Sequence, residues 1–265
     1  MQVALAVAGA AGRMGRCVVA LAAADTRFRL VAALDQRSSG LLGQDAGECA
    51  GISRCGVGIS EHYDDAFDVM IDFSTPVATH GWLELCSRRH RPIVIGTTGH
   101  TADQSAAIET FAKRIAVLKS ANMSVGVNVL LRLVEQLAAH LGDEYDAELI
   151  ETHHRFKADA PSGTALALRD AIIRGRGTPA DVVFGRHGLG SSRQIGQIGI
   201  HSVRAGDIVG EHEVRFSTMG ETVIVRHAAH SRDTFARGAL AAAAWIIGRP
   251  PGLYGMGDVL FNATD

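Results

Sequence analysis

The sequence is poor in lysine, in aromatic residues and in long apolar runs. Lys113, Lys119 and Lys157 are the three lysines, against 23 arginines, and aromatic residues make up 5% of the 265 residues. No apolar run reaches the roughly eighteen residues that a membrane-spanning helix needs. The N-terminus enters an apolar strand instead of a signal peptide. We therefore expect a cytoplasmic protein without a membrane partner.

The charge balance and the cysteines exclude further classes of protein. The net charge of −2 argues against a nucleic-acid partner, which would favour a basic face. The cysteines show neither paired nor metal-ligand spacing, so we interpret them as free thiols in a reducing cytoplasm. Oxidised pairing remains an open alternative from sequence. The four cysteines are Cys17, Cys49, Cys55 and Cys86.

The N-terminal residues predict a strand, a glycine-rich turn and a helix in succession. The apolar run Val3 to Ala8 enters a turn with the spacing G-x-x-G-x-x-G, and an apolar helical stretch continues to Ala24. Such glycines let the backbone approach a pyrophosphate at a helix N-terminus, although they also serve plain tight packing. The candidate dinucleotide-binding residues of this turn are Gly9, Ala10, Ala11, Gly12, Arg13, Met14 and Gly15.

A carboxylate follows the second predicted strand. Leu30 to Leu34 ends in Asp35, twenty residues after Gly15. An acidic group at this place can accept hydrogen bonds from the adenosine ribose hydroxyls, and a solvated strand-end charge is the plain alternative. The position of Asp35 strengthens the interpretation of the glycine turn as a dinucleotide site.

Short apolar strands then alternate with helices. Strands are predicted at residues 69–73, 93–95 and 115–118, with helices at 78–89 and 102–114. This alternation is typical of a parallel, doubly wound sheet, in which ligands bind at the carboxyl ends of the strands. Small polar segments fall at those ends, at residues 72–76, 96–99 and 120–123.

The rest of the chain predicts a different architecture. An amphipathic helix is expected from Ser124 to His140, and strands at residues 200–204, 207–217 and 222–227. Residues 38–58 are expected to form a long loop, and residues 185–199 either a mobile lid or a long loop. The fold class predicted for these strands and helices is α+β.

One stretch concentrates groups that can handle protons and anions. His153, His154 and Lys157 precede Ser162, Gly163 and Thr164, which open an apolar helical run. A histidine can give up a proton near neutral pH, a lysine supplies a fixed charge, and free N–H groups at a helix start can hold an anion. The plain alternative is an N-cap, a turn and solvated side chains. We favour a small acid that is held while it receives a proton.

This stretch, from Glu148 to Ala165, resembles the signature of the 4-hydroxy-tetrahydrodipicolinate reductase (dihydrodipicolinate reductase) family. The sequence Gly-Arg-Met-Gly at residues 12–15 and the segments 41–47 and 204–212 also resemble that family, so the resemblance covers the chain from Gly9 to Leu260. It implies an enzyme of lysine and diaminopimelate biosynthesis that reduces a cyclic dicarboxylate with NADH or NADPH. It also implies a homotetramer.

The resemblance implies a domain plan and roles for particular residues. A Rossmann-like α/β domain, residues 1–124 and 233–265, would bind the dinucleotide, and an inserted α+β domain with an open mixed sheet, residues 125–232, would bind substrate and form the oligomer. His153 would be the general acid, Lys157 would stabilise charge, and His154 would bind a carboxylate edge. Substrate would also be held by Ser162, Gly163, Thr164 and Thr98. Further cofactor contacts would come from Gln36, Gly96, Thr97, Thr98, Ala121, Asn122 and Met123.

The position after Asp35 departs from the family members that accept NADPH. Those members place a basic residue there to meet the 2′-phosphate, whereas this chain has Gln36, followed by Arg37. Asp35 itself would repel a phosphate. We expect NADH to be used well, and NADPH to be tolerated if Arg37, Arg13 or Arg16 reaches its phosphate.

Three other interpretations are weighed against this one. A different nicotinamide enzyme normally uses a cysteine nucleophile or another acid–base set, and no cysteine lies in a suitable polar segment. A nucleotide-sensing regulator would bind cofactor without turnover and gives no reason for the His-His-x-x-Lys segment. No metal site is predicted, because the later histidines lack a carboxylate or cysteine at ligand spacing and are expected to be solvated or at a sheet interface. These histidines are His201, His212, His227 and His230.

Overall fold

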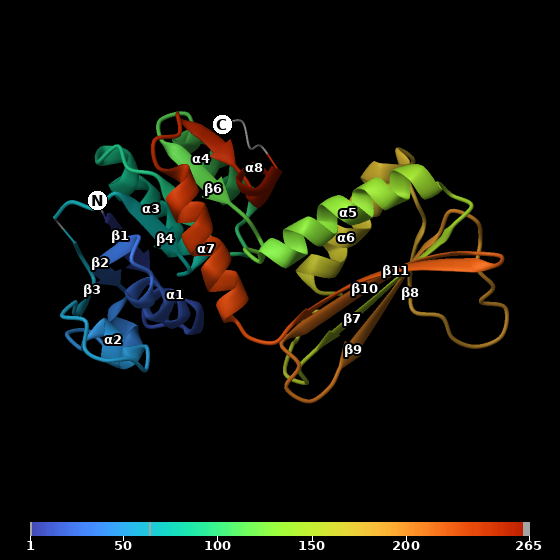
Figure 1. Ribbon diagram of the computed structural model, residues 1–265, viewed down its shortest axis with the longest axis horizontal. Coiled ribbons are helices and arrows are strands. Elements are labelled where there is room, and N and C mark those ends of the chain that lie inside the picture. Colours follow the sequence, from blue (N-terminus) through green and yellow to red (C-terminus); the bar gives the residue numbers. More distant parts are fainter. Residues whose placement is uncertain (1, 64, 262–265) are drawn as a thin grey trace. The chain divides into compact units, whose positions relative to one another are not determined.

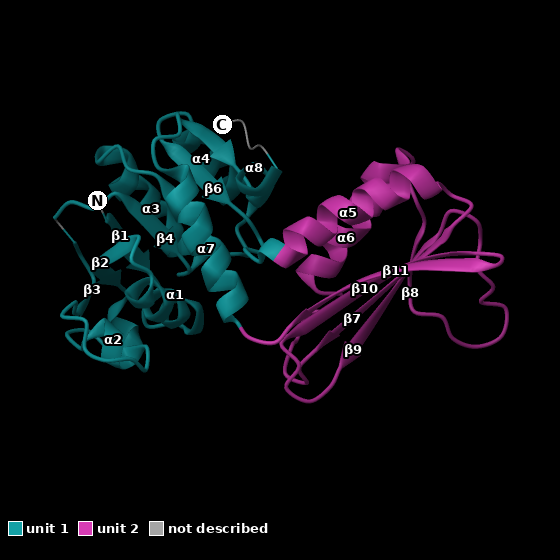
Figure 2. Ribbon diagram, in the orientation of Figure 1, with its two compact units in different colours: residues 1–125, 232–265 teal, residues 126–231 magenta. Residues whose placement is uncertain are grey.

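The structure, a computed structural model, describes residues 2–63 and 65–261. The chain divides into two compact units, of which unit 1 comprises residues 1–125 and 232–265 and unit 2 comprises residues 126–231 (Figures 1 and 2). The chain therefore leaves unit 1, forms unit 2 and returns. The sequence prediction places these boundaries after residues 124 and 232.

Unit 1 is built on a parallel sheet of seven strands, ordered β12-β6-β5-β4-β1-β2-β3. Every pairing between its strands is parallel. The strands are β1 (Val3–Ala8), β2 (Phe28–Leu34), β3 (Ile59–Ser60), β4 (Val69–Asp72), β5 (Ile93–Ile95), β6 (Ala116–Lys119) and β12 (Gly252–Tyr254). This is the doubly wound α/β arrangement that the alternation of apolar segments predicts.

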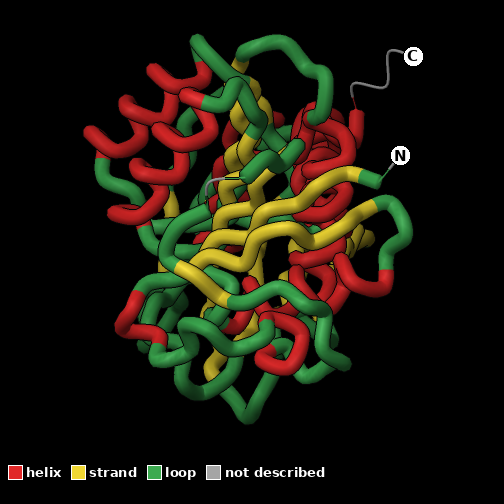
Figure 3. Tube along the Cα trace, turned by 90° about the vertical axis from the view of Figure 1, so that its left-hand side faces the viewer, coloured by secondary structure: helices red, strands yellow, loops and turns green. Residues whose placement is uncertain are grey.

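Helices cover both faces of this sheet (Figure 3). In β1, Leu5 and Val7 pack in one apolar cluster with α1 and α7, while Ala6 and Ala8 pack in a second cluster with α3 and α4. Successive residues of a strand point to opposite faces, so both sides of β1 are buried and its run is continuously apolar. The helices of unit 1 are α1 (Arg13–Ala24), α2 (Ala46–Cys49), α3 (Pro76–Arg88), α4 (Ala102–Ala112), α7 (Asp233–Ile246) and α8 (Met256–Phe261).

Unit 2 contains a mixed sheet of five strands, ordered β11-β10-β7-β9-β8. Strand β10 runs antiparallel to both of its neighbours, whereas β7, β9 and β8 pair in parallel. Helices α5 (Val125–Leu141) and α6 (Gly163–Arg176) pack on one face of the sheet (Figure 1). The strands are β7 (Asp146–His153), β8 (Val182–Phe184), β9 (Ile198–Arg204), β10 (Gly210–Thr218) and β11 (Glu221–Ala229).

Some predicted boundaries are wrong. Residues 207–209 precede β10 and are not part of a strand, and β8 was not predicted. The predicted loop at 38–58 contains the short 3₁₀ helix η1 (Arg37–Ser39) and α2. The buried carboxylate of Asp45 organises this segment, because it accepts hydrogen bonds from the backbone N–H groups of Gly47, Glu48, Cys55 and Gly56. Such side-chain contacts have no periodicity that a sequence pattern could reveal.

The described residues contain neither a candidate membrane span nor a candidate metal cluster. None of their helices combines the length and apolar character needed to cross a bilayer. Among residues 2–63 and 65–261, no group of three or more histidine, cysteine, aspartate or glutamate side chains is arranged to hold a metal ion. The four cysteines are free thiols, and Cys86 is buried.

Candidate functional site

The glycine turn after β1 is shaped by close backbone contacts. Gly9 has φ +76°, and a Cβ there or at Gly15 would clash with neighbouring backbone, at Phe73 and at Gly9 respectively. These two glycines therefore serve tight packing. Gly12 precedes α1, and within the described residues no side chain caps this helix N-terminus. The first N–H groups of a helix lack intrahelical partners, so this turn can receive an anion.

Asp35 binds the turn directly. Its Oδ2 accepts a hydrogen bond of 2.8 Å from the backbone N–H of Ala11, and its Oδ1 accepts one from Gln36 N. The end of β2 and the turn before α1 are thereby held together. Asp35 is thus more than the solvated charge that was the plain alternative, and it stays partly exposed beside the turn.

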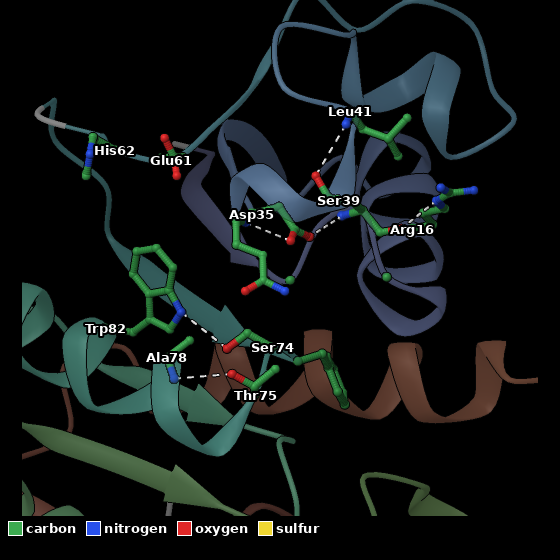
Figure 4. Close-up of a pocket in the computed structure, with 15 residues that line it drawn as sticks. Arg16, Asp35, Ser39, Leu41, Glu61, His62, Ser74, Thr75, Ala78 and Trp82 are labelled. Atoms are coloured by element: carbon green, nitrogen blue, oxygen red, sulfur yellow. Dashed lines mark hydrogen bonds between the residues drawn. The ribbon is translucent and has the colours of Figure 1, made fainter.

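A pocket of about 480 Å³ opens beside this turn (Figure 4). Of the residues that the sequence predicts for the cofactor, it is lined by Gly9, Ala11, Gly12, Asp35 and Gln36. The pocket also has a side that the site prediction did not include. That side comprises Phe73, Ser74, Thr75, Ala78 and Trp82, and Trp82 Nε1 donates a hydrogen bond to Ser74 Oγ.

The arginines near the pocket are already engaged. Arg37 Nε donates to Glu61 Oε2 over 2.6 Å, and Arg16 Nε donates to the carbonyl oxygen of Ala11 over 2.8 Å. Arg13 is exposed. Glu61 lines the pocket, so two carboxylates, those of Asp35 and Glu61, lie on its β2 and β3 side.

The segments after β5 and β6 are structurally constrained. A Cβ at Gly96 would clash with the ring of Phe73, and Thr97 is buried and donates its hydroxyl to the carbonyl of Asp72. Thr98 and Ala121 are exposed, Asn122 Oδ1 accepts a hydrogen bond from Ser124 N, and Met123 is buried against α7 at Gly238. Of the other predicted residues, Ala10 lies in the turn itself, and Arg13, Met14 and Gly15 are the first residues of α1.

In unit 2, His153 is the last residue of β7 and is buried. Its Nδ1 lies 2.5 Å from Glu151 Oε2. Glu151 is two residues earlier and therefore on the same face of the strand. Its carboxylate also receives a two-pronged interaction from Arg204 in β9, at 2.9 and 2.7 Å. His153 is thus held by a buried ion pair that joins two neighbouring strands.

The electrostatics of these groups follow from burial and contact. Burial raises the pKa of Glu151, but the hydrogen bonds from Arg204, Ser202 and His153 outweigh it and lower the pKa to about 2. Burial lowers the pKa of His153 below its ordinary value, against the opposing effect of Glu151. Glu151 is therefore an anion at neutral pH, and it partly offsets the cost of protonating the buried imidazole.

Ser162 is the N-cap of α6, and its hydroxyl accepts a hydrogen bond from Ala165 N. Its backbone N–H is donated to Glu151 Oε1 over 3.2 Å. The prediction that Ser162 offers a free N–H to an anion is therefore wrong, because the N–H is used inside the protein. The hydroxyl contacts His212 Nε2 at 3.1 Å.

His212 was predicted to be solvated or at a sheet interface, and solvation is wrong. The residue is 4% exposed, lies opposite Glu151 in β10, and its ring meets the ring of His153 edge to face at a centroid distance of 5.1 Å. Burial, with a further contribution from His153, lowers the pKa of His212 to about 3. The ring is therefore neutral at neutral pH.

The remaining predicted residues lie in the loop between β7 and α6. Lys157 Nζ donates to Asp159 Oδ1 over 2.8 Å. Successive residues of a strand point to opposite faces, but β7 ends at His153. His154 lies outside the strand, so its side chain need not point away from that of His153. Its Nδ1 is buried, and within the described residues it has no hydrogen-bond partner. Gly163 is exposed and Thr164 partly exposed at the start of α6.

The glycine-rich segment after β8 is anchored on the opposite face of the sheet. Arg186 and Arg193 both reach Glu148, which alternates with Glu151 and His153 along β7 and points to the other face. His201 Nε2 contacts the same carboxylate at 2.7 Å. The segment is a long loop tied down by Glu148.

Glu151, Arg204 and His212 were not among the predicted site residues. Glu151 and Arg204 are 53 positions apart, and Ser162 and His212 are 50 apart, so no local motif joins them. The sequence does contain one indication that Glu151 belongs to the site, because residues two apart in a strand lie on the same face. Once His153 was placed in a strand, Glu151 followed as its neighbour.

Comparisons with known proteins agree on one family. Residues 3–123 match the family described as dihydrodipicolinate reductase, N-terminus, and residues 126–260 match dihydrodipicolinate reductase, C-terminus. A curated protein of Thiobacillus denitrificans, named 4-hydroxy-tetrahydrodipicolinate reductase, is 49% identical over 265 residues, with 98% of this chain and 99% of the relative covered. A protein of the same name from Hahella chejuensis is 47% identical, with 97% and 98% covered.

A solved structure shows the same fold. Its description is dipicolinate-bound dihydrodipicolinate reductase from Paenisporosarcina sp. TG-14, and it superposes with a TM-score of 0.76 at 24% identity, covering 96% of this chain and 98% of the other. Amine dehydrogenase from Mycobacterium smegmatis superposes less closely, with a TM-score of 0.57 at 15% identity, covering 94% of each chain. From the family matches and the sequence identities, the chain belongs to the dihydrodipicolinate reductase family.

Proposed function

We infer that the protein is a 4-hydroxy-tetrahydrodipicolinate reductase of lysine and diaminopimelate biosynthesis. The reaction consumes (4S)-4-hydroxy-2,3,4,5-tetrahydrodipicolinate, NAD(P)H and a proton, and forms 2,3,4,5-tetrahydrodipicolinate, NAD(P)⁺ and water. The curated relatives that carry this name match almost the whole chain at 44–49% identity. The buried His153, backed by an ionised Glu151, is the structural observation that carries the proposal, because it supplies the proton that the reaction needs.

Unit 1 fits the dinucleotide. The N-terminus of α1, which no side chain caps among the described residues, would hold the pyrophosphate, and Asp35 would accept hydrogen bonds from the ribose hydroxyls. The pocket lined by Gly12, Asp35 and Trp82 is of the size of a small-ligand site. When bound, the nicotinamide would supply the hydride that adds to ring carbon 4 once the 4-hydroxyl group has left as water. Residues 96–98 and 121–123 are proposed for the nicotinamide end of this site.

Unit 2 holds the dicarboxylate and the acid. The solved relative carries dipicolinate, a planar dicarboxylate with the ring and carboxylate spacing of the substrate. Lys157 and the start of α6, from Ser162 to Thr164, bind the carboxylates, with Ser162 contributing its hydroxyl and not its N–H. His154 binds a carboxylate edge through its imidazole ring.

The proton is delivered by His153. Addition of hydride to the conjugated imine leaves negative charge that a proton must neutralise. A histidine side chain can donate that proton at little cost, because the ordinary pKa of an imidazolium lies near neutral pH. Burial keeps the imidazole mostly neutral in the free protein. The arrival of a dianion favours the protonated form, because opposite charges at short range raise the pKa of a base.

NADH is the cofactor expected to be used well. Asp35 and Glu61 both place negative charge at the ribose end, and Glu61 holds Arg37, the basic residue best placed to meet a 2′-phosphate. A large preference for NADPH in catalytic efficiency would contradict this. Both cofactors carry the same nicotinamide, so NADPH should also support turnover, with a lower catalytic efficiency than NADH.

The oligomer expected from the family would form on the open face of the unit 2 sheet. Strand registers place Ile150, Val203 and Ile224 on the face opposite to α5 and α6. Val203 and Ile224 are 42% and 48% exposed, which is unusual for apolar residues of a central sheet. We expect four copies to pack through this face, and a monomer in sedimentation equilibrium would contradict it.

The test is turnover by the purified protein. Substrate is generated in situ from pyruvate and aspartate semialdehyde, and loss of NADH absorbance is followed with and without pyridine-2,6-dicarboxylate. Oxidation that the dicarboxylate blocks supports both the reaction and the anion site. Tight NADH binding without oxidation would overturn the reductase and favour the alternative of a nucleotide-sensing regulator.

A further inference from the structure

The carboxylate of Glu151 is the most connected buried charge in unit 2. It is 0% exposed, and its two oxygens accept from His153 Nδ1, both terminal nitrogens of Arg204 and the backbone N–H of Ser162. These donors come from β7, from β9 and from the N-cap of α6. A single carboxylate thereby joins the acid, the neighbouring strand and the start of the helix that is proposed to hold substrate.

The contact with Glu151 determines which nitrogen of His153 can exchange a proton. An ionised carboxylate only accepts hydrogen bonds, so Nδ1 must carry hydrogen in both protonation states of the ring. Nε2 is then the nitrogen that gains and loses the proton. Gly210 in β10 leaves room at that nitrogen, because a Cβ at residue 210 would lie 3.0 Å from it.

We propose that Glu151 and Arg204 are positioning residues for His153. Glu151 fixes the Nδ1–H tautomer and raises the proton affinity of Nε2, and Arg204 keeps Glu151 ionised while limiting that increase. The inference rests on the proposed role of His153 as proton donor. Neither Glu151 nor Arg204 need touch the substrate.

The charged and titratable groups around His153 act in opposite directions. On its own strand, Glu151 raises the pKa of the imidazole. From β9, Arg204 lowers it, and from the loop after β7, Lys157 lowers it, itself paired with Asp159. From β10, the neutral ring of His212 packs against His153 edge to face. Removing Glu151 should therefore lower the pKa of His153, whereas removing Arg204 should raise it.

Two substitutions should move the pH profile in opposite directions. Glu151→Gln keeps the size of the side chain and removes the charge, so the alkaline decline of kcat should move to lower pH, by about 1 to 3 units. On the alkaline side of the decline, kcat at a given pH should fall about tenfold for each unit by which the pKa of His153 is lowered. Arg204→Gln removes a nearby cation, so the decline should move to higher pH.

Glu135→Gln is the matched control. Glu135 is a glutamate of α5 that pairs with Arg174 of α6, so the change also removes a paired carboxylate, but away from the proposed site and from the sheet face proposed for the oligomer. Its pH profile should equal that of the unaltered protein. A uniform loss of kcat in Glu151→Gln at every pH, with the decline unmoved, would mean a merely structural role and would overturn the inference.

The tautomer provides a second test that needs no altered catalytic site. Nitrogen-15 NMR of the intact protein, with the His153 signals assigned by their loss in His153→Gln, should show protonated Nδ1 and unprotonated Nε2 in the neutral ring. A neutral ring protonated at Nε2 would overturn the inference even if Glu151→Gln did not fold. Absence of turnover in the unaltered protein would instead overturn the proposed function and leave the tautomer result to decide this one.

Discussion

The two units are built to bind charge by different means. In unit 1 the proposed anion site is formed by backbone N–H groups, at a glycine turn and a helix N-terminus. In unit 2 the site is made of ionised and polar side chains, with Glu151, His153 and His212 each at most 9% exposed. A backbone site has no proton to give, whereas a buried imidazole beside a carboxylate does. The contrast agrees with the proposal that unit 1 binds the dinucleotide and unit 2 delivers the proton.

The strongest way to break the backbone site is to add one methyl group. In Gly15→Ala the new Cβ would clash with the carbonyl of Gly9, so the turn must shift. We expect a loss of about 1–3 kcal/mol of stability and an NADH Kd weakened by at least about tenfold, which is about 1.4 kcal/mol. Both tryptophans, Trp82 and Trp245, belong to unit 1, so tryptophan fluorescence during unfolding reports on this unit.

The matched control for that variant is Gly81→Ala. Gly81 is an exposed residue within α3, and a Cβ there meets nothing within 4 Å. Alanine favours a helix over glycine by about 0.5–1 kcal/mol, so this variant should be slightly more stable and bind NADH normally. Equal loss of NADH affinity in both variants would contradict the role given to the turn.

The buried histidine of unit 2 should show in the pH dependence of stability. The folded pKa of His212, about 3, lies below its ordinary value of 6.5, so the unfolded chain binds the additional proton. Stability is therefore lost as pH falls below 6.5, with a contribution approaching about 1.4 kcal/mol per pH unit. In His212→Gln, which keeps an N–H near Ser162, we expect this contribution to vanish.

The measurement is urea unfolding between pH 6.5 and 5, above the range in which Glu151 titrates. The other histidines are present in both proteins, so the difference between the two slopes reports on residue 212 together with its effect on the neighbouring His153. Parallel stability curves for the two proteins would show that His212 takes up protons in the folded state, contrary to its burial.

The smallest expected effect concerns the choice of dinucleotide. Glu61→Gln releases Arg37 from its ion pair and removes a negative charge beside the pocket. We expect the ratio of kcat/KM for NADPH to that for NADH to rise by only a few fold, because charge pairs exposed to solvent contribute little. The double variant Glu61→Gln with Arg37→Gln should lose the part of this gain that Arg37 provides, and Glu109→Gln on α4 is the control. A gain that survives in full in the double variant would exclude Arg37 as the cause.

The two sites differ in how much of them the sequence reveals. The glycine turn and Asp35 could be predicted because they are consecutive residues at the ends of two strands, and the parallel sheet because its strands are continuously apolar. The partners of His153 come from β9, β10 and α6, and only the folded chain brings them together. For the same reason the sequence could not decide whether His212 is solvated or at a sheet interface, and it left the Ser162 N–H free. In the structure His212 is buried, and the Ser162 N–H is donated to Glu151.

The most direct test is to measure both kcat and the Kd for NADH in a variant that lacks the proposed acid. In His153→Ala, and likewise in Lys157→Ala, kcat should fall by about 10² to 10⁴, the usual cost of losing a positioned acid, while the NADH Kd stays within about twofold of the unaltered value. His140→Ala, an exposed histidine at the end of α5, is the control for kcat. Near-normal turnover in His153→Ala and Lys157→Ala would contradict the assignment of proton delivery to unit 2.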